Sequence, residues 1–424
     1  MKLFENSFSG LKFTNFVLNN GLEVYLNKNN SNPIVNITLG YKIGSKDEPE
    51  GKKGIAHLFE HLMFQGSENV KKMEHFGIVQ ECGGSANAYT MQDFTAYYDI
   101  VPSSHIETAL WLESDRMISI DLSEENLENQ KSVVIEEKKQ RYDNEPYGTA
   151  LLKILENIFF NSGYSVSTIG IEEDIRSFKT HEAVEFHKTF YSPSNAVLII
   201  SGDIDYSQTE RIVEKYFGGI EKPAKIERNI NRIEKYNKNE KITVNDNVSL
   251  NNIYLCWQAG LPGSASEFAF DCFAEIFAGR KSSRLNIKFV RDEKIFKSIS
   301  SALYQLQDSG VFIVSGMLNP GIDENYAKAK LVNEINLILK EGISEPEFEK
   351  SKNLYSVNML NKLSSIRSVS FDSLFDYMYF GNPSEIINKF ERLSNLGKEE
   401  LMDSLKKYLR DDNYFELIYL PKSV

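Results

Sequence analysis

Similar patterns of predicted secondary structure occur twice in this chain, and this duplication limits the folds that it can adopt. The segment SANAYTMQDFTAYYDIVP is typical of two strands joined around Gln92, and SISSALYQLQDSGVFIVSGMLNP is typical of two strands joined around Gln307. Downstream, a predicted helix start at Ser123 has a counterpart at Ser344. The offsets, 215 residues for the glutamines and 221 residues for the serines, are nearly constant. We therefore expect two halves that fold alike.

Each half is predicted to belong to the α+β class. Alternating apolar residues at 35–41 indicate a strand, and the amphipathic pattern at 106–118 indicates a helix. Hairpin signals favour an antiparallel or mixed sheet backed by helices. A stretch rich in Lys, Glu and Asn separates the halves. The predicted organisation is therefore an N-terminal domain at 1–217, a linker at 218–247 and a homologous C-terminal domain at 248–424.

The composition excludes several classes of protein. With 41% hydrophobic and 25% charged residues, the chain resembles an ordinary globular protein, and its net charge of -12 argues against nucleic-acid binding. No apolar run approaches the roughly 18 residues of a membrane span. Three cysteines without a CxxC pair exclude a disulfide framework. The chain as given begins without an apolar signal segment, so we expect a cytoplasmic protein.

The segment GIAHLFEHLMFQG carries the residues with the clearest chemical potential, His57, Glu60 and His61. On a helix, the two histidines lie about one turn apart on the same face, so both imidazoles can bind one metal ion. The adjacent Glu60 can take a proton from a water molecule without being a ligand itself. A hydrolytic zinc site needs one more protein ligand and an open position.

Two candidates for the third ligand lie in the segment QKSVVIEEKKQ, namely Glu136 and Glu137. Helical periodicity places Glu137 on the face of Val133 and Val134 and turns Glu136 away from it. An inward carboxylate is costly to bury unless it is paired or bound to a metal. The alternative is that a buried arginine such as Arg141 pairs with Glu137.

The HxxEH order is the signature of inverzincins. The sequence resembles the M16 family of zinc metallopeptidases, which includes pitrilysin, insulin-degrading enzyme and the mitochondrial processing peptidase. The resemblance covers most of residues 20–205, through GGSANAYTMQDFTAYY, WLESDRM, VVIEEKKQRYDNEPYG and YSPSNAVLIISGD. Glu137 follows His61 by 76 residues, which matches the family's third ligand. The resemblance implies a Zn²⁺ cofactor and two repeated halves, the C-terminal one non-catalytic, that face each other across a chamber.

The resemblance also implies a substrate-binding strand. Residues Gly84, Ser85, Asn87 and Ala88 match the family's edge strand, which binds an extended peptide through main-chain hydrogen bonds. The alternative is a plain hairpin strand in which the glycines permit a bulge.

Two positions depart from the family pattern. Gln130 stands where many relatives have a second glutamate, and it can still orient a neighbour by hydrogen bonding. Arg291 matches an arginine that completes the family's site, but the accompanying tyrosine is replaced by Ser298. The resemblance then implies a zinc-bearing subunit that forms a homodimer, or a heterodimer with an Arg/Tyr subunit of the same family. The alternative is that a nearby tyrosine such as Tyr304 substitutes.

The leading hypothesis is a zinc endopeptidase of short or unfolded peptides, in which His57, His61 and Glu137 bind the metal and Glu60 is the general base. One alternative is a zinc subunit that is inactive until it is paired. Two weaker alternatives are a non-catalytic scaffold subunit and an Fe(II) oxygenase, since two histidines and one carboxylate also describe its facial triad. The remaining histidines lack ligand spacing, and we expect surface or packing roles for His75, His105, His181 and His187.

Overall fold

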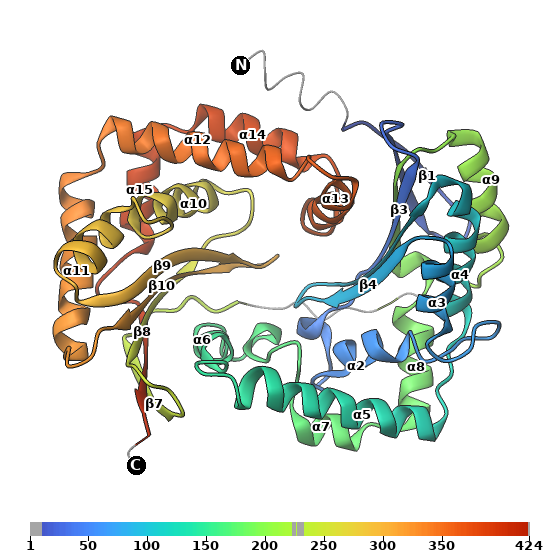
Figure 1. The fold of residues 1–424 in the computed structure, drawn as a ribbon, viewed down its shortest axis with the longest axis horizontal. Coiled ribbons are helices and arrows are strands. Elements are labelled where there is room, and N and C mark those ends of the chain that lie inside the picture. Colours follow the sequence, from blue (N-terminus) through green and yellow to red (C-terminus); the bar gives the residue numbers. More distant parts are fainter. Residues whose placement is uncertain (1–10, 223–225, 227–232, 423–424) are drawn as a thin grey trace. The chain divides into compact units, whose positions relative to one another are not determined.

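The computed structural model describes residues 11–222, 226 and 233–422, and Figure 1 shows the order of the elements along the chain. The described residues form two compact units, each assembled from three stretches of sequence. The first unit contains the described residues of 1–137, 166–230 and 360–388, and the second contains those of 138–165, 231–359 and 389–424.

The first unit contains a six-stranded sheet with the order β1-β2-β6-β3-β5-β4. Strands β2 and β6 run parallel, and the other neighbours run antiparallel. The strands are β1 (Phe13–Val17), β2 (Glu23–Lys28), β3 (Ile34–Tyr41), β4 (Ser85–Thr90), β5 (Thr95–Pro102) and β6 (Ala196–Gly202).

The second unit contains a five-stranded sheet with the order β7-β11-β8-β10-β9. Strands β7 and β11 run parallel and the other neighbours run antiparallel, as in the first sheet without β1. This agreement in order and direction confirms the α+β class and the duplication that the sequence predicts. The strands are β7 (Glu240–Asp246), β8 (Asn252–Ala259), β9 (Phe296–Gln305), β10 (Gly310–Leu318) and β11 (Phe415–Pro421).

Helices cover both sheets. Those in or beginning in the first unit are α2 (Ile55–Leu62), α3 (Glu74–Glu81), α4 (Ile106–Ile118), α5 (Glu124–Lys138), α7 (Glu172–Ser177), α8 (Thr180–Phe190), α9 (Tyr206–Phe217) and α13 (Ile366–Phe380). The others are α6 (Ala150–Ile158), α10 (Ala265–Phe277), α11 (Glu324–Glu341), α12 (Glu345–Asn361), α14 (Glu385–Asn395) and α15 (Lys398–Tyr408). Short 3-10 and π helices lie at η1 (Ser45–Asp47), η2 (Ser103–His105), η3 (Lys139–Asp143), η4 (Gly163–Ser165), η5 (Pro193–Asn195) and η6 (Asn286–Asp292).

The strand at 35–41, the helix at 106–118 and both hairpins lie where the sequence predicts them. Strand β3 is buried along nearly its whole length instead of alternating, because α4 and α13 both pack against it. Gly40 permits the approach of α13, since a Cβ at this position would lie 2.5 Å from Leu374 Cδ1. Within the described residues, none of the helices combines the length and the apolar character that a membrane crossing requires.

The two halves of the sequence exchange one helix each. Helix α13, from the C-terminal half, packs Leu374 and Tyr377 onto Val197 and Ile199 of the first sheet, and its orange-red ribbon lies near that sheet in Figure 1. Helix α6, from the N-terminal half, packs onto β8 and β11 in the core of the second unit. The predicted ranges 1–217 and 248–424 are therefore wrong in treating each domain as continuous. The reason is that amphipathic periodicity shows that a helix has an apolar face but does not show which sheet covers it.

The predicted linker at 218–247 is also too long. Its last residues form β7, in which Ile242 and Val244 alternate with polar residues and the strand pairs with β11. The high content of Lys, Glu and Asn hides this short alternation in the sequence. Residues 223–225 and 227–232 of the predicted linker lie outside the described residues.

His187 is a packing residue of the first unit, in agreement with the expectation from the sequence. It is buried in α8, its Nε2 lies 3.1 Å from the carbonyl oxygen of Arg116, and its ring stacks on Tyr191. Burial lowers the pKa of His187 from 6.5 to about 4.

The low pKa of His187 makes the protein less stable in acid. The unfolded chain takes up this proton as the pH falls below about 6.5, and the folded chain resists it until about pH 4, so stability falls across this window. We expect wild type to lose more unfolding free energy than H187Q between pH 7.5 and 5, by up to about 1.4 kcal/mol per pH unit inside the window. Urea denaturation in the presence of a chelator measures the difference. Equal losses in the two proteins would contradict this assignment.

Candidate metal centre

Helix α2 is anchored at its N-terminus by a buried carboxylate. Glu48, which is 4% exposed, accepts the backbone N–H of Gly54 (2.8 Å) and the backbone N–H of Ala56 (2.8 Å). The chain enters the helix through Gly54 at φ 101°, a conformation that favours glycine. Burial raises the pKa of Glu48, and the two backbone hydrogen bonds and the charge of Lys53 oppose that rise. Glu48 therefore fixes the first turn of α2.

One face of α2 packs in the core and another presents two imidazoles. Phe59 stacks on Tyr191, with ring centroids 5.3 Å apart, and this contact sets the rotation of the helix. His57 and His61 then project from the same face, with ring centroids 4.9 Å apart. His57 is buried and His61 is half-buried. The predicted arrangement of the two histidines is present.

Helix α5 supplies the third group. Glu137 Oε2 lies 3.2 Å from His61 Nε2 and 3.9 Å from His57 Nε2, whereas Glu136 is exposed. The reasoning that selects Glu137 is only partly right, because Val134 is buried and Val133 is exposed. The inward face of α5 instead follows Leu127, Gln130 and Val134, and it continues to Glu137.

The alternative partner for Glu137 does not have the burial that it requires. Arg141 is exposed in η3, the short helix after α5, so it is not the buried arginine that this alternative needs. The contacts of Glu137 with the two histidines agree with a metal-binding role.

The three groups fit a metal ion by geometry and by donor chemistry. One ligand atom from each of His57, His61 and Glu137 lies within 4.8 Å of the others. Two imidazole nitrogens and one carboxylate oxygen are a donor set of catalytic zinc sites, which keep a fourth position for water or substrate. The same set can hold Fe(II), so the donors alone do not exclude the oxygenase alternative.

Glu60 lies on α2 between the ligands and the sheet. The hydroxyl of Thr90, the last residue of β4, donates a hydrogen bond to Glu60 Oε2 at 2.6 Å. Helix α2 and strand β4 are thus in direct contact. Glu60 is half-buried. It is not one of the three converging groups, and its predicted role as a base requires that it is not a ligand.

Strand β4 lies at the edge of the first sheet and, among the described strands, pairs with β5 alone. Gly84 precedes it, where a Cβ would lie 2.4 Å from the carbonyl oxygen of Ile100, so a larger residue would displace the strand. Ser85 and Asn87 are exposed, and Asn87 Oδ1 accepts the backbone N–H of Ala88 at 2.9 Å. The edge that the sequence predicts is present, and its role in peptide binding stays a prediction.

Two further predicted site residues have structural positions of their own. Gln130 is buried on the face of α5 that carries Val134, two turns before Glu137. Arg291 is exposed in η6 of the second unit, where its Nε donates to Asp292 Oδ1 at 2.7 Å. The hydrogen bond and the charge of Asp292 raise the pKa of Arg291. The roles of both residues, and the enclosed chamber, stay predictions.

A second group of metal-ligating residue types is a buried ion network. His75 Nε2 lies 3.1 Å from Asp99 Oδ1, and Arg116 forms an ion pair with Glu113. The Arg116 guanidinium also lies 4.3 Å from the ring centroid of Tyr97. Glu113 and Arg116 come from the WLESDRM segment. Because Arg116 already supplies positive charge and every member of the group is buried, we interpret the group as structural.

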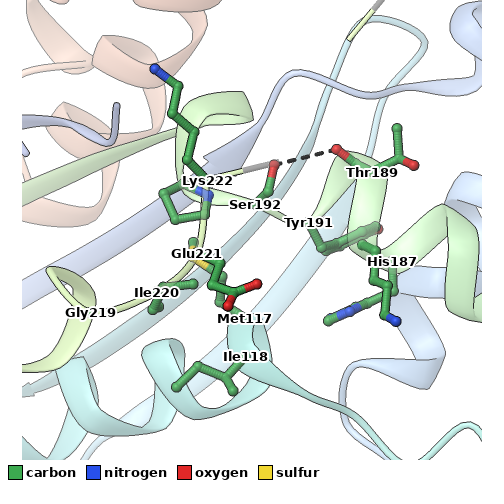
Figure 2. A pocket seen from close by; sticks show the side chains of 12 residues that line it. Met117, Ile118, His187, Thr189, Tyr191, Ser192, Gly219, Ile220, Glu221 and Lys222 are labelled. Carbon is green, nitrogen blue, oxygen red and sulfur yellow. Dashed lines mark hydrogen bonds between the residues drawn. The ribbon is translucent and has the colours of Figure 1, made fainter. Parts of the chain in front are cut away.

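A cavity of about 730 Å³ lies elsewhere in the first unit (Figure 2). His187, Tyr191 and Ser192 line one side, and Gly219 to Lys222 line another. His57, His61 and Glu137 do not line this cavity. Lys222 is the last lining residue, and residues 223–225 lie outside the described residues. We assign no function to this cavity.

The sequence analysis missed Glu48 and Thr90. Glu48 lies six residues before the helix start at Gly54, so no N-cap spacing identifies it. Thr90 lies in the segment that resembles the family's edge strand, but strand periodicity gives no sign that its hydroxyl reaches a helix 30 residues earlier. The Glu48 contacts are local but follow no cap spacing, and the Thr90 contact depends on tertiary structure.

Comparison with known proteins places the chain in a family. Residues 23–170 match the model described as Insulinase (Peptidase family M16), and residues 178–355 match the model described as Peptidase M16 inactive domain. The zinc protease PqqE of Helicobacter pylori is 26% identical over 414 residues, which cover 94% of this chain and 91% of that protein. The uncharacterized zinc protease YmxG of Bacillus subtilis is 25% identical over 394 residues, covering 91% of this chain and 94% of that protein.

A solved structure agrees with these matches. The crystal structure of a protease from Helicobacter pylori aligns with a TM-score of 0.91 at 25% identity, covering 97% of this chain and all of that chain. Together the two family models match most of the sequence, from Glu23 to Tyr355. The chain therefore belongs to peptidase family M16.

Proposed function

We propose that this protein is a zinc-dependent endopeptidase that cleaves short or unfolded peptides. The observation that carries the proposal is the convergence of His57, His61 and Glu137 beside Glu60 and the edge strand β4. The names of the relatives, which include zinc proteases, support the same class of reaction.

In this proposal the chain divides the chemistry between ligands and a base. His57, His61 and Glu137 would hold the ion. A bound zinc ion would lower the pKa of a coordinated water molecule and polarise the scissile carbonyl. Glu60 accepts the proton of the attacking water molecule and later delivers it to the leaving amine nitrogen.

Strand β4 would hold the substrate. An extended peptide pairs with an exposed edge through main-chain hydrogen bonds, which give affinity without demanding a particular sequence. The backbone N–H of Ala88 would exchange its bond to Asn87 Oδ1 for a peptide carbonyl. A folded protein does not present such a segment, so this mode of binding favours short or unfolded peptides.

A second candidate function is that of a zinc-bearing subunit that needs a partner. It is favoured by Ser298, which stands where the family has a tyrosine, and by Arg291, which is exposed and bonded to Asp292. A homodimer, or a heterodimer with an Arg/Tyr subunit, would then complete the site. A non-catalytic scaffold is disfavoured because the three ligands and Glu60 are all present. The cytoplasmic location stays a prediction.

The choice of Glu137 over its neighbour can be tested by metal content. We expect wild type and E136Q to retain about one zinc per chain after dialysis, and E137Q to lose most of it, because a neutral amide is a far weaker zinc ligand. Metal analysis of the purified proteins measures the ratio. Stoichiometric zinc in E137Q would contradict the ligand assignment. Stoichiometric iron in wild type, with oxygen consumption, would favour the oxygenase.

The role of Glu60 can be tested by turnover. We expect the zinc-loaded wild type to cut members of a mixed set of unstructured peptides, and E60Q to keep its zinc and lose at least about 100-fold in rate, because the amide cannot accept the proton. Mass spectrometry of the products, counting only Glu60-dependent fragments, measures this. Retained turnover in E60Q would refute the base. A zinc-loaded wild type without turnover would favour the subunit that needs a partner.

A further inference from the structure

The contact between Thr90 and Glu60 links the proposed general base to the end of the edge strand. The distance of 2.6 Å between Thr90 Oγ1 and Glu60 Oε2 lies in the range of a strong hydrogen bond from a hydroxyl to a carboxylate. Threonine is branched at Cβ, so its side chain has few rotamers and its hydroxyl direction follows the strand backbone. A glutamate has three rotatable side-chain bonds, so a fixed donor restricts it strongly.

The end of β4 is itself held in place. Thr90 pairs with Thr95 of β5, and the turn between them is closed by the Met91 N–H, which donates to the Phe94 carbonyl oxygen at 2.8 Å. A second segment, Gly44 to Glu48, contacts this turn, and we call it the brace. The Lys46 N–H donates to the Gln92 carbonyl oxygen at 3.0 Å.

Side chains reinforce the same contact. Lys46 Nζ lies 2.8 Å from Asp93 Oδ1, and both side chains are buried. Gly44 lies against the turn so closely that a Cβ would be 2.3 Å from the Gln92 carbonyl oxygen. The brace and the β4–β5 turn therefore behave as one packed piece.

The brace also ends at the residue that anchors α2. Glu48 accepts the N–H groups of Gly54 and Ala56 and so holds the helix that carries Glu60. One five-residue segment thus holds the turn that follows Thr90 through a main-chain hydrogen bond, and it holds the helix of Glu60 through the side chain of Glu48. The spacing of the two side chains is set by this shared support.

We propose that Thr90 is a positioning residue: its hydroxyl holds the Glu60 carboxylate in the orientation in which it can accept a proton from the attacking water. This inference rests on the proposed peptidase function. Thr90 donates its own hydrogen to Glu60, so it orients the base and takes no part in the proton transfer. A base must lie within hydrogen-bond reach of the proton that it abstracts, and small displacements of reacting groups cost large factors in rate.

The test removes the hydroxyl without changing the side-chain shape. T90V is expected to lower kcat by about 10-fold to 100-fold with KM within about 2-fold of wild type, and with full zinc content. T90S, which keeps the hydroxyl, is expected to retain at least about a third of wild-type kcat. The matched control is T38V, which removes another buried hydroxyl of the same sheet, one that bonds Asn36, and its kcat should be unchanged.

Three kinetic results would overturn the proposal. The first is a T90V kcat within about 2-fold of wild type. The second is a rise in KM with kcat unchanged, which would make Thr90 a peptide contact. The third is an equal loss in T90S and T90V, which would indicate that the strand itself is disturbed. A labelled peptide from the turnover survey should bind E60Q and T90V/E60Q with the same Kd, and weaker binding to the double variant would also contradict a role through Glu60.

A structural comparison separates this inference from the proposed function. In crystal structures of wild type and T90V, the Glu60 carboxylate should occupy one defined position in wild type and leave it in T90V. An unchanged Glu60 in T90V would overturn the positioning role whether or not the chain is a peptidase. A zinc-loaded wild type that cuts no peptide would instead count against the proposed function, and the crystallographic comparison would still decide the role of Thr90.

Discussion

The buried side chain of Glu48 makes the interactions on which the geometry of the candidate metal centre depends. Helix α2 has only eight residues, and a helix this short has little stability of its own in water. Its first turn is held by two hydrogen bonds to Glu48, and its rotation is set by Phe59 in the core. The directions of both histidines and of Glu60 follow from these two restraints. Because Glu48 ends the brace that also holds the β4–β5 turn, the ligands and the edge strand share one support.

The duplicated scaffold carries this chemistry in one half. In the order of elements, α10 lies between β8 and β9 as α2 and α3 lie between β3 and β4. Helix α10 is mostly apolar, and Cys272 and Ile276 are buried in it, so its surface serves packing. The first half has two shorter helices in this region, and the first of them carries the candidate ligands His57 and His61. The same sheet order thus supports a candidate metal site in one unit and a packed helix in the other.

Local spacing explains what could be predicted from the sequence. The one-turn separation of His57 and His61 and the periodicity of α5 depend on helix geometry alone, so these ligands could be chosen before the fold was known. Periodicity wrongly places Val133 on the inward face of α5. It still selects Glu137, because Leu127, Gln130 and Val134 define nearly the same face.

Contacts between distant segments explain what could not be predicted. Glu48 and Thr90 act through partners that no periodic pattern connects to them. Strand β7 lies in a charged stretch that masks its alternation. The assignment of α6 and α13 to sheets depends on which apolar surface each helix contacts, and sequence periodicity does not show this.

The exchange of α6 and α13 has a consequence for the order in which the protein is made. During synthesis the strands of the first sheet emerge from the ribosome long before residues 366–380. One apolar face of β3 and β6 therefore stays uncovered until α13 has been translated. In the second sheet the order of synthesis is reversed, since α6 is synthesised before every strand that it covers. The scaffold of the metal centre is therefore completed late, by a helix that contributes no ligand. The first sheet can therefore gain this cover only after residues 366–380 have been translated.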